Sequence, residues 1–494
     1  MFAKFSTQTD GKLFFRYVIP SMISMVTAGV YTLVDGLFVG WGAGNTGLAA
    51  INVAFPLSLL IVAFGEMIGA GGAVNLALAR GRGERRAADL FFGNSLMLVI
   101  PATMLTLLLI PVLDPVLGII GAAPELLPAA REYGAITLGG GFFLMATVAL
   151  VAAMRNDRAP RLAMAVMVVG LVANILLDWL LVIVLAGGVA GSAWATVLSQ
   201  ALCFALAAGY YLGGYSSFRF DRRNFRFRLP AVRRIIAAGL PSFGMQLSAA
   251  AVILLHNRQA LLYGGVAAVA AYSIISYVEA VILLLLQGVG LGIQPVVGFL
   301  HGAEETFRRN RMMRLGVISA LGIGVGGLLL SAGGNRLIPG LFNATGEVAV
   351  LAGKGLLLSA LVYPLLGFQK VSEACFQSMD RAGKASLLVY LDCCVALPLS
   401  LLLLPLWFGV DGIWAAMPAS KLVMFAVALV LWNLGGREAP EAEPVPIFPA
   451  ENRGRFFAFT EGYDIVNYST QTGCDERKFQ RYRRSDAETV RPVG

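Results

Sequence analysis

The stretch VYTLVDGLFVG, residues Val30–Gly40, places a carboxylate, Asp35, inside an apolar run that extends over residues 14–40. An ionised side chain at the centre of a bilayer costs about 2.5–3.5 kcal/mol or more, so such a residue faces a cavity or a partner. The stretch therefore predicts a transmembrane helix that carries a functional acid.

The composition of the whole chain points to an integral membrane protein. Of its 494 residues, 57% are hydrophobic and 14% are charged, and the mean hydropathy is +0.75. Soluble domains carry about 25% charged residues. The apolar runs are long and do not alternate with a period of two, which predicts an all-α membrane protein rather than a barrel. We expect twelve spans, near residues 14–40, 50–78, 90–112, 131–153, 162–185, 191–213, 236–262, 268–299, 314–334, 352–376, 387–407 and 412–434.

Basic residues are distributed unevenly between the predicted loops. The loops after even-numbered spans hold 20 Lys and Arg residues, whereas those after odd-numbered spans hold Arg336 and little else. Short loops rich in Lys and Arg face the cytoplasm, which predicts that both termini are cytoplasmic. The net charge of +9 is thereby explained by topology, and no nucleic-acid partner is expected.

A shift of 221 residues aligns the two halves of the chain almost without gaps. Pro20–Ser21 falls on Pro241–Ser242, and Gly81 falls on Gly302. Each half contains six predicted spans, and an even number returns the chain to its starting side, so the repeats are parallel.

The repeat predicts the domain organisation. We expect an N-lobe over residues 1–213 (helices 1–6), a basic cytoplasmic linker over 214–235 and a C-lobe over 236–436 (helices 7–12). The tail, 437–494, is Pro-rich and polar, which predicts a disordered cytoplasmic segment. Two similar lobes enclose a cleft, and rocking one against the other alternates access to that cleft, as in secondary transporters.

Two acids inside the N-lobe are the main candidates for coupling transport to a cation. Asp35 has Tyr31 four residues before it, and Asp178 has Asn174 four residues before it, so each acid shares a helix face with a polar group. The repeat has lost both acids, because His256 and Leu399 stand 221 residues later. Paired carboxylates can take up and release a proton or a sodium ion. The alternative is a carboxylate hydrogen-bonded between helices for structure.

The other charged residues within spans are weaker candidates for the lining of the substrate cleft. Lys370 and Glu373 have the spacing of a helix ion pair, and the stem of Lys421 is long enough to reach the membrane surface. No metal site is expected beyond a possible sodium ion at Asp35 and Asp178. The cleft candidates beside Tyr31 and Asn174 are Glu66, His256, Arg258 and Glu279, of which His256 and Arg258 are expected to pair with an acid such as Glu279.

Nothing in the sequence predicts an enzyme. It contains no P-loop, no H-E-x-x-H and no G-x-S-x-G motif. Transport must then be driven by an ion gradient, with no cofactor other than the coupling ion. A membrane-embedded transferase would need clustered acids in an aqueous loop, and Asp114, Glu125 and Glu347 are scattered.

Several motifs resemble the multidrug and toxic compound extrusion (MATE) family over residues 10–435. They are VDGLFVGWGAGNTGLAAINVAFP in the first helix, GAGGAVNLALARGRGE after the second, AMRNDRAPR after the fourth, NILLDWLLV in the fifth, and FQSMDRAGKAS and GVDGIWAA in the second half. The resemblance is to the bacterial branch whose coupling carboxylates lie in the N-lobe.

The resemblance implies an antiporter of the bacterial inner membrane that exports organic cations or amphipathic drugs in exchange for protons or sodium. It assigns the coupling role to Asp35 and Asp178, and we expect a monomer. Where other members carry an acid in the seventh helix, this chain has His256 and Arg258. The alternative within the same superfamily is a flippase for a lipid-linked or anionic amphipathic substrate, which would need basic residues lining the cleft.

Overall fold

The computed structural model describes residues 9–120, 122–218, 224–342 and 344–435, which form helices and contain no strand. The chain divides into two units, Met1–Glu441 and Ala442–Gly494. The predicted disordered tail, 437–494, lies outside the described residues. Every helix given below belongs to the first unit.

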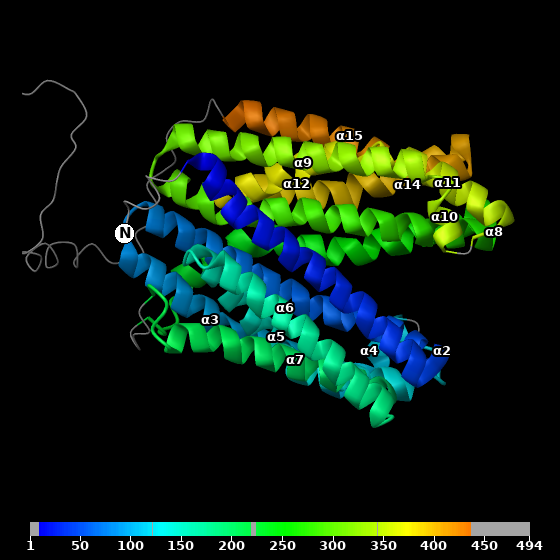
Figure 1. Ribbon diagram of the computed structural model, residues 1–494, viewed down its shortest axis with the longest axis horizontal. Helices are drawn as coiled ribbons and strands as arrows, with labels where there is room; N and C mark the ends of the chain where they lie inside the picture. Colours follow the sequence, from blue (N-terminus) through cyan, green and yellow to red (C-terminus); the bar gives the residue numbers. More distant parts are fainter. Residues whose placement is uncertain (1–8, 121, 219–223, 343, 436–494) are drawn as a thin grey trace, which may run out of the picture. The chain divides into compact units, whose positions relative to one another are not determined.

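The helices follow the order of the two predicted lobes (Figure 1). Those of the N-lobe are α2 (Asp10–Gly81), α3 (Arg85–Leu107), η1 (Ile110–Val112), α4 (Leu113–Ile120), α5 (Leu127–Asn156), α6 (Pro160–Asp178), η2 (Trp179–Val184) and α7 (Gly188–Leu212). Those of the C-lobe are α8 (Leu229–Gly302), α9 (Thr306–Gly334), α10 (Ile338–Leu341), α11 (Gly346–Ala360), α12 (Tyr363–Ser378), α13 (Ala382–Leu391), η3 (Asp392–Ala396), α14 (Leu397–Phe408) and α15 (Val410–Gly435).

The described part of the chain contains ten helical segments that are long and apolar enough to cross a membrane. One further pair, α11 and α12, is bent by 48° and brings the number to eleven if the pair forms one span. The predicted number of twelve is thus not confirmed. The seventh and eighth predicted spans both fall within α8, which bends at Gly265.

The backbone reproduces the 221-residue repeat. Gly44, which divides α2 into two spans, has a φ of +66°, and its repeat mate Gly265 in α8 has a φ of +61°. Gly188 and Gly409, at the starts of α7 and α15, have φ values of +54° and +58°. Glycine adopts this left-handed region without steric penalty, so the same residue type bends the chain at matching places in both halves.

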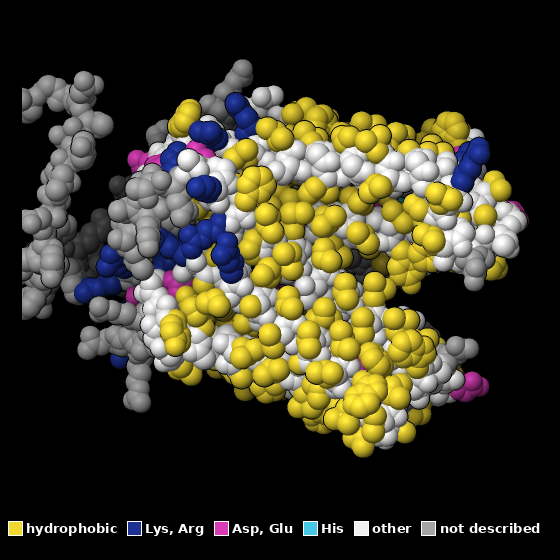
Figure 2. Space-filling model, in the orientation of Figure 1, with side chains coloured by type: hydrophobic (Ala, Val, Ile, Leu, Met, Phe, Trp, Pro, Cys, Tyr) yellow, Lys and Arg dark blue, Asp and Glu magenta, His cyan; other side chains and the backbone are white. Residues whose placement is uncertain are grey.

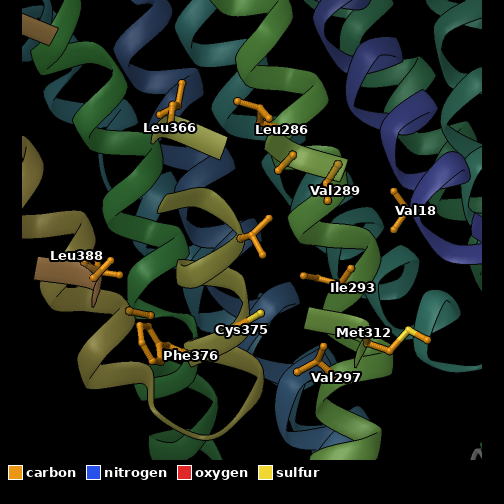
Figure 3. Close-up of a cluster of buried hydrophobic side chains, with 14 of the residues drawn as sticks. Val18, Leu286, Val289, Ile293, Val297, Met312, Leu366, Cys375, Phe376 and Leu388 are labelled. Carbon is orange, nitrogen blue, oxygen red and sulfur yellow. The ribbon is translucent and has the colours of Figure 1, made fainter. Parts of the chain in front are cut away.

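The first span of α2 packs against both lobes. Leu13, Phe14 and Val18, each at most 3% exposed, belong to the same buried cluster as Ile293 and Val297 of α8. Figure 3 shows Val18 facing Ile293 in this cluster. Tight packing of this kind associates helices in a bilayer, where lipid is as apolar as the side chains. The start of α2 therefore belongs to the C-lobe core, although its sequence lies in the N-terminal repeat.

Glycines bring the two lobes into backbone contact at one end of the spans. A Cβ atom on Gly302 would lie 2.3 Å from the carbonyl oxygen of Leu78, and one on Gly81 would lie 2.1 Å from that of Phe299. Gly81 and Gly302 are repeat mates, so this contact relates the ends of α2 and α8 symmetrically. Small residues at such positions are the usual means of close helix approach in membranes.

The same end of the molecule carries most of the basic side chains. Figure 2 shows Lys and Arg gathered there, and it shows the surface hollowed between the lobes toward the opposite end. Arg308 of α9 donates to Asp10 at 2.9 Å, and Arg311 lies 3.4 Å from the same carboxylate. Because Asp10 begins α2, these ion pairs join the repeats where the glycines meet.

The glycine contact predicts a stability effect that depends on position. Gly302→Ala would force the lobes apart locally, and we expect a loss of about 1–3 kcal/mol, as for other overpacked sites. Gly322→Ala in α9 is the control, because a Cβ there meets nothing within 4 Å; it should be neutral or stabilising by up to about 1 kcal/mol. Thermal unfolding of the purified protein measures both, and equal effects would contradict the role of the contact.

Candidate functional site

Asp35 lies in the first span of α2 and is 9% exposed. Ser192 Oγ, near the start of α7, donates a hydrogen bond of 2.7 Å to Asp35 Oδ1. No salt bridge to Asp35 is formed by any described residue. The carboxyl group thus has a single hydroxyl partner, which leaves capacity for a proton or a cation on its second oxygen.

Asp178 is the last residue of α6 and is fully buried. Neither of its carboxyl oxygens has a hydrogen-bond partner, and neither amide atom of Asn174, one turn earlier, has one. Asn174 lies close enough to interact electrostatically with Asp178, although the pair does not reach hydrogen-bond geometry. The π-helical segment η2 follows directly, and such segments are frequent at functional sites.

Asp35 and Asp178 belong to one buried polar site of the N-lobe. The two carboxyl groups interact electrostatically with each other. A close approach between helices makes this possible, since a Cβ on Gly42 of α2 would lie 2.4 Å from Val182 Cγ1 of η2. The structure thus brings together the two acids that the sequence singled out.

Tyr31 lies beside the acids but does not bond to Asp35. Its hydroxyl is 3.0 Å from Ser199 Oγ of α7 and interacts electrostatically with both carboxyl groups. Thr196, between Ser192 and Ser199 on α7, has an unpartnered buried hydroxyl. The sequence analysis missed these α7 hydroxyls, although their spacing of four and three residues places them on one helix face.

The site around the two acids is rich in oxygen atoms, and no described basic side chain forms an ion pair with either acid. Buried polar atoms without partners are uncommon, and each costs about 1–3 kcal/mol. Carboxylate, amide and hydroxyl oxygens are ligands that hard cations prefer. No cluster of three or more His, Cys, Asp or Glu side chains suited to a metal ion occurs in the part of the chain that the structure describes. The chemistry that this site can support is thus that of carboxyl groups with hydroxyl and amide neighbours.

Glu66 lies away from this pocket. It lines a separate cavity with Arg155 and Gln294, between α2, α5 and α8. Arg155 is the charged group that interacts with it. The structure thus gives Glu66 a basic neighbour and does not bring it to Asp35 and Asp178.

The C-lobe candidates His256, Arg258 and Glu279 do not pair with one another as expected. The Nδ1 of His256 is 2.9 Å from the carbonyl oxygen of Val252, and its ring stacks on Tyr272 with centroids 4.8 Å apart. Arg258 is exposed. Glu279 is buried, and the cation that interacts with it is Lys421, so the predicted pairing with His256 or Arg258 is wrong.

Lys421 does not extend to the membrane surface. It is 6% exposed and forms an ion pair with Asp392 of η3, which the sequence analysis did not predict. The expected pair of Lys370 with Glu373 is confirmed, at 2.8 Å. Asp392 and Lys421 are 29 residues apart in sequence, and no short-range pattern reveals such a pair.

Comparison with protein families decides the class of the chain. The MatE family model matches residues 20–180 and again residues 241–406, once in each lobe. The chain belongs to the MATE family of transporters. Curated relatives include the multidrug export protein MepA of Staphylococcus haemolyticus, 22% identical over 86% of this chain and 94% of that protein. The probable multidrug resistance protein YoeA of Bacillus subtilis is 24% identical over 84% and 91%.

Solved structures share the fold of this MATE protein. One is described as the outward-facing conformation of a multidrug resistance MATE family transporter, with a TM-score of 0.81, 23% identity, and coverage of 87% of this chain and 96% of that one. Another, with the same values, is a transporter of the MOP superfamily from Pyrococcus furiosus. At this identity the likeness establishes the fold alone.

The unpartnered state of Asp178 predicts an unusual stability effect. Asp178→Asn removes a buried acid that has no hydrogen bond to lose, so we expect the melting temperature to stay the same or rise. Asp157→Asn is the control, because Asp157 is buried and bonded to Arg80 and Tyr210. Breaking a buried pair costs about 3–5 kcal/mol, so its melting temperature should fall. A comparable fall for Asp178→Asn would show that Asp178 is structural.

Proposed function

We propose that this MATE protein is an ion-coupled exporter of organic cations and amphipathic drugs. The relatives named as multidrug export and multidrug resistance proteins support this substrate class. The observation that carries the coupling is the N-lobe pocket, where Asp35 and Asp178 lie together without a basic partner. Acids of this kind inside a membrane mark ion and proton pathways.

The coupling follows from competition for the same negative charge. A proton or sodium ion bound at Asp35 and Asp178 neutralises the pocket, whereas release of that ion restores charge that attracts a cationic substrate. Binding shifts the equilibrium between two conformations by its differential affinity for them. A membrane potential adds about 2.3 kcal/mol per charge per 100 mV, which supplies a driving force without a nucleotide.

The arrangement of the lobes supports alternating access. They meet through backbone contacts at the end rich in Arg and Lys, and the hollow between them opens toward the other end. If the basic end is cytoplasmic, as the loop charges predict, this conformation faces outward. Opening toward the cytoplasm then requires separation at Gly81 and Gly302 and release of Asp10 from Arg308.

The membrane spans and the relatives also indicate where the protein is located. The spans and the bacterial relatives support a multi-pass protein of the bacterial plasma membrane, with both termini in the cytoplasm. A monomer remains our prediction. The flippase alternative receives no support from Lys421, because its ammonium group is already paired with Asp392.

The test measures dye transport by inverted membrane vesicles under separate pH and sodium gradients. We expect wild-type transport to follow at least one gradient, and Asp35→Asn and Asp178→Asn to lose that dependence at normal expression, since each loses an exchangeable charge. Asp411→Asn is the matched control, because Asp411 is an exposed acid paired with Lys354, and it should transport normally.

Gradient-driven transport at the wild-type rate in Asp35→Asn would remove the coupling role of that residue. Transport of a lipid-linked anion in place of cationic dyes would favour the flippase.

A further inference from the structure

A second cluster of buried charged residues lies in the C-lobe. It contains a lysine, Lys421, whereas no described lysine or arginine forms an ion pair with Asp35 or Asp178 in the N-lobe. Lys421 of α15 is 6% exposed, and its ammonium group bonds to Asp392 Oδ2. Gln369 of α12 donates to the same oxygen at 3.3 Å and to Glu373 at 2.8 Å. The second oxygen of Glu373 is occupied by Lys370. All the charged groups of this cluster except one therefore have an ionic or hydrogen-bonded partner.

The exception is Glu279 of α8, which is 8% exposed. Its Oε1 atom is buried and has no hydrogen-bond partner, and Lys421 is the cation that interacts with it electrostatically. Two more buried acceptors in the cluster lack partners, Asp392 Oδ1 and Gln369 Oε1. The ammonium group thus lies among acceptor oxygens that exceed the available donors.

An ammonium group suits such a site because it is a compact charge with three rotatable donors. One donor is directed to Asp392, which leaves two for Glu279 and the free amide oxygen of Gln369. A sodium ion would find the same oxygen ligands acceptable. Lys421 therefore places a positive charge where a free monovalent cation would otherwise be coordinated.

The repeat shows what this lysine replaces. Gly188 and Gly409 align at a shift of 221 residues, and the same shift places Lys421 on Gln200 of α7. The N-terminal repeat therefore has a neutral amide at the position where the C-lobe has the cation of Lys421.

We propose that Lys421 serves as the tethered cation of the C-lobe, so that the coupling ion binds only in the N-lobe. The proposal rests on the proposed coupling function. It makes Lys421 the residue that determines how many ions accompany each substrate. His256 also interacts electrostatically with Lys421. It does not serve as the cation of the cluster, because its Nδ1 contacts the carbonyl oxygen of Val252 and its ring stacks on Tyr272.

The test introduces the residue of the N-terminal repeat, Lys421→Gln, and measures binding of radioactive sodium to the full-length purified chain at alkaline pH. All variants also carry Asp35→Asn and Asp178→Asn, so that the N-lobe cannot contribute. We expect no saturable sodium binding in this background and one bound sodium ion per chain after Lys421→Gln. Adding Asp392→Asn should abolish the new site.

Lys370→Gln in the same background is the matched control, because it removes one partly buried, ion-paired positive charge from the same lobe and leaves the pair of Lys421 with Asp392 in place. It should bind no sodium. Three results would each overturn the proposal. The first is Asp392-dependent sodium binding in the background that keeps Lys421. The second is no sodium binding by folded Lys421→Gln, and the third is equal binding by Lys370→Gln. The chain with intact Asp35 and Asp178, measured in parallel, reports separately on the proposed coupling.

A double-mutant cycle covers the case in which Lys421→Gln alone does not fold. Lys421→Gln combined with Asp392→Asn removes both charges of the pair and leaves neither uncompensated. Glu279→Gln should lower the melting temperature of the wild type, where it removes a negative charge that interacts with Lys421, but not that of the double variant. The same fall in both backgrounds would show that Lys421 and Glu279 are not coupled and would overturn the proposal.

Discussion

The hydrocarbon around the spans does not solvate an ionised side chain, so a charged residue inside them needs a charged or polar partner or access to a water-filled cavity. Individual acids meet this constraint in different ways. In the C-lobe, Asp392 has Lys421 and Glu373 has Lys370. In the N-lobe, Asp178 has no hydrogen bond. Both lobes share one backbone plan, and this difference in pairing is the reason for proposing ion exchange at Asp178 and not at Asp392.

Local backbone irregularity places these acids. Asp178 ends α6 immediately before the π-helical segment η2, and Asp392 begins the π-helical segment η3. A π-turn leaves backbone groups and side chains out of the regular register, which directs an acid toward the lobe interior rather than along a uniform helix face.

The sequence predicted the class of fold because a hydrophobic run and its flanking charges are local properties. It also singled out Asp35 and Asp178, since an acid in an apolar run is visible without a structure, and the two acids lie close enough to interact electrostatically. Their coupling role stays a prediction. It could not predict the partner of Lys421, because pairing between α15 and η3 depends on how helices pack in three dimensions.

The first span of α2 links the coupling site to the contact between the lobes. Its early residues, including Phe14 and Val18, pack in the C-lobe core, while Asp35 further along bonds to Ser192 in the N-lobe. Pro20 lies between these segments, and proline removes a helix hydrogen bond and permits bending there. Under the proposed coupling, a change in the charge of Asp35 would alter how the later part of α2 is held. Because the early part packs in the other lobe, that change would act on the angle between the lobes, which is the movement that the proposed alternating access requires.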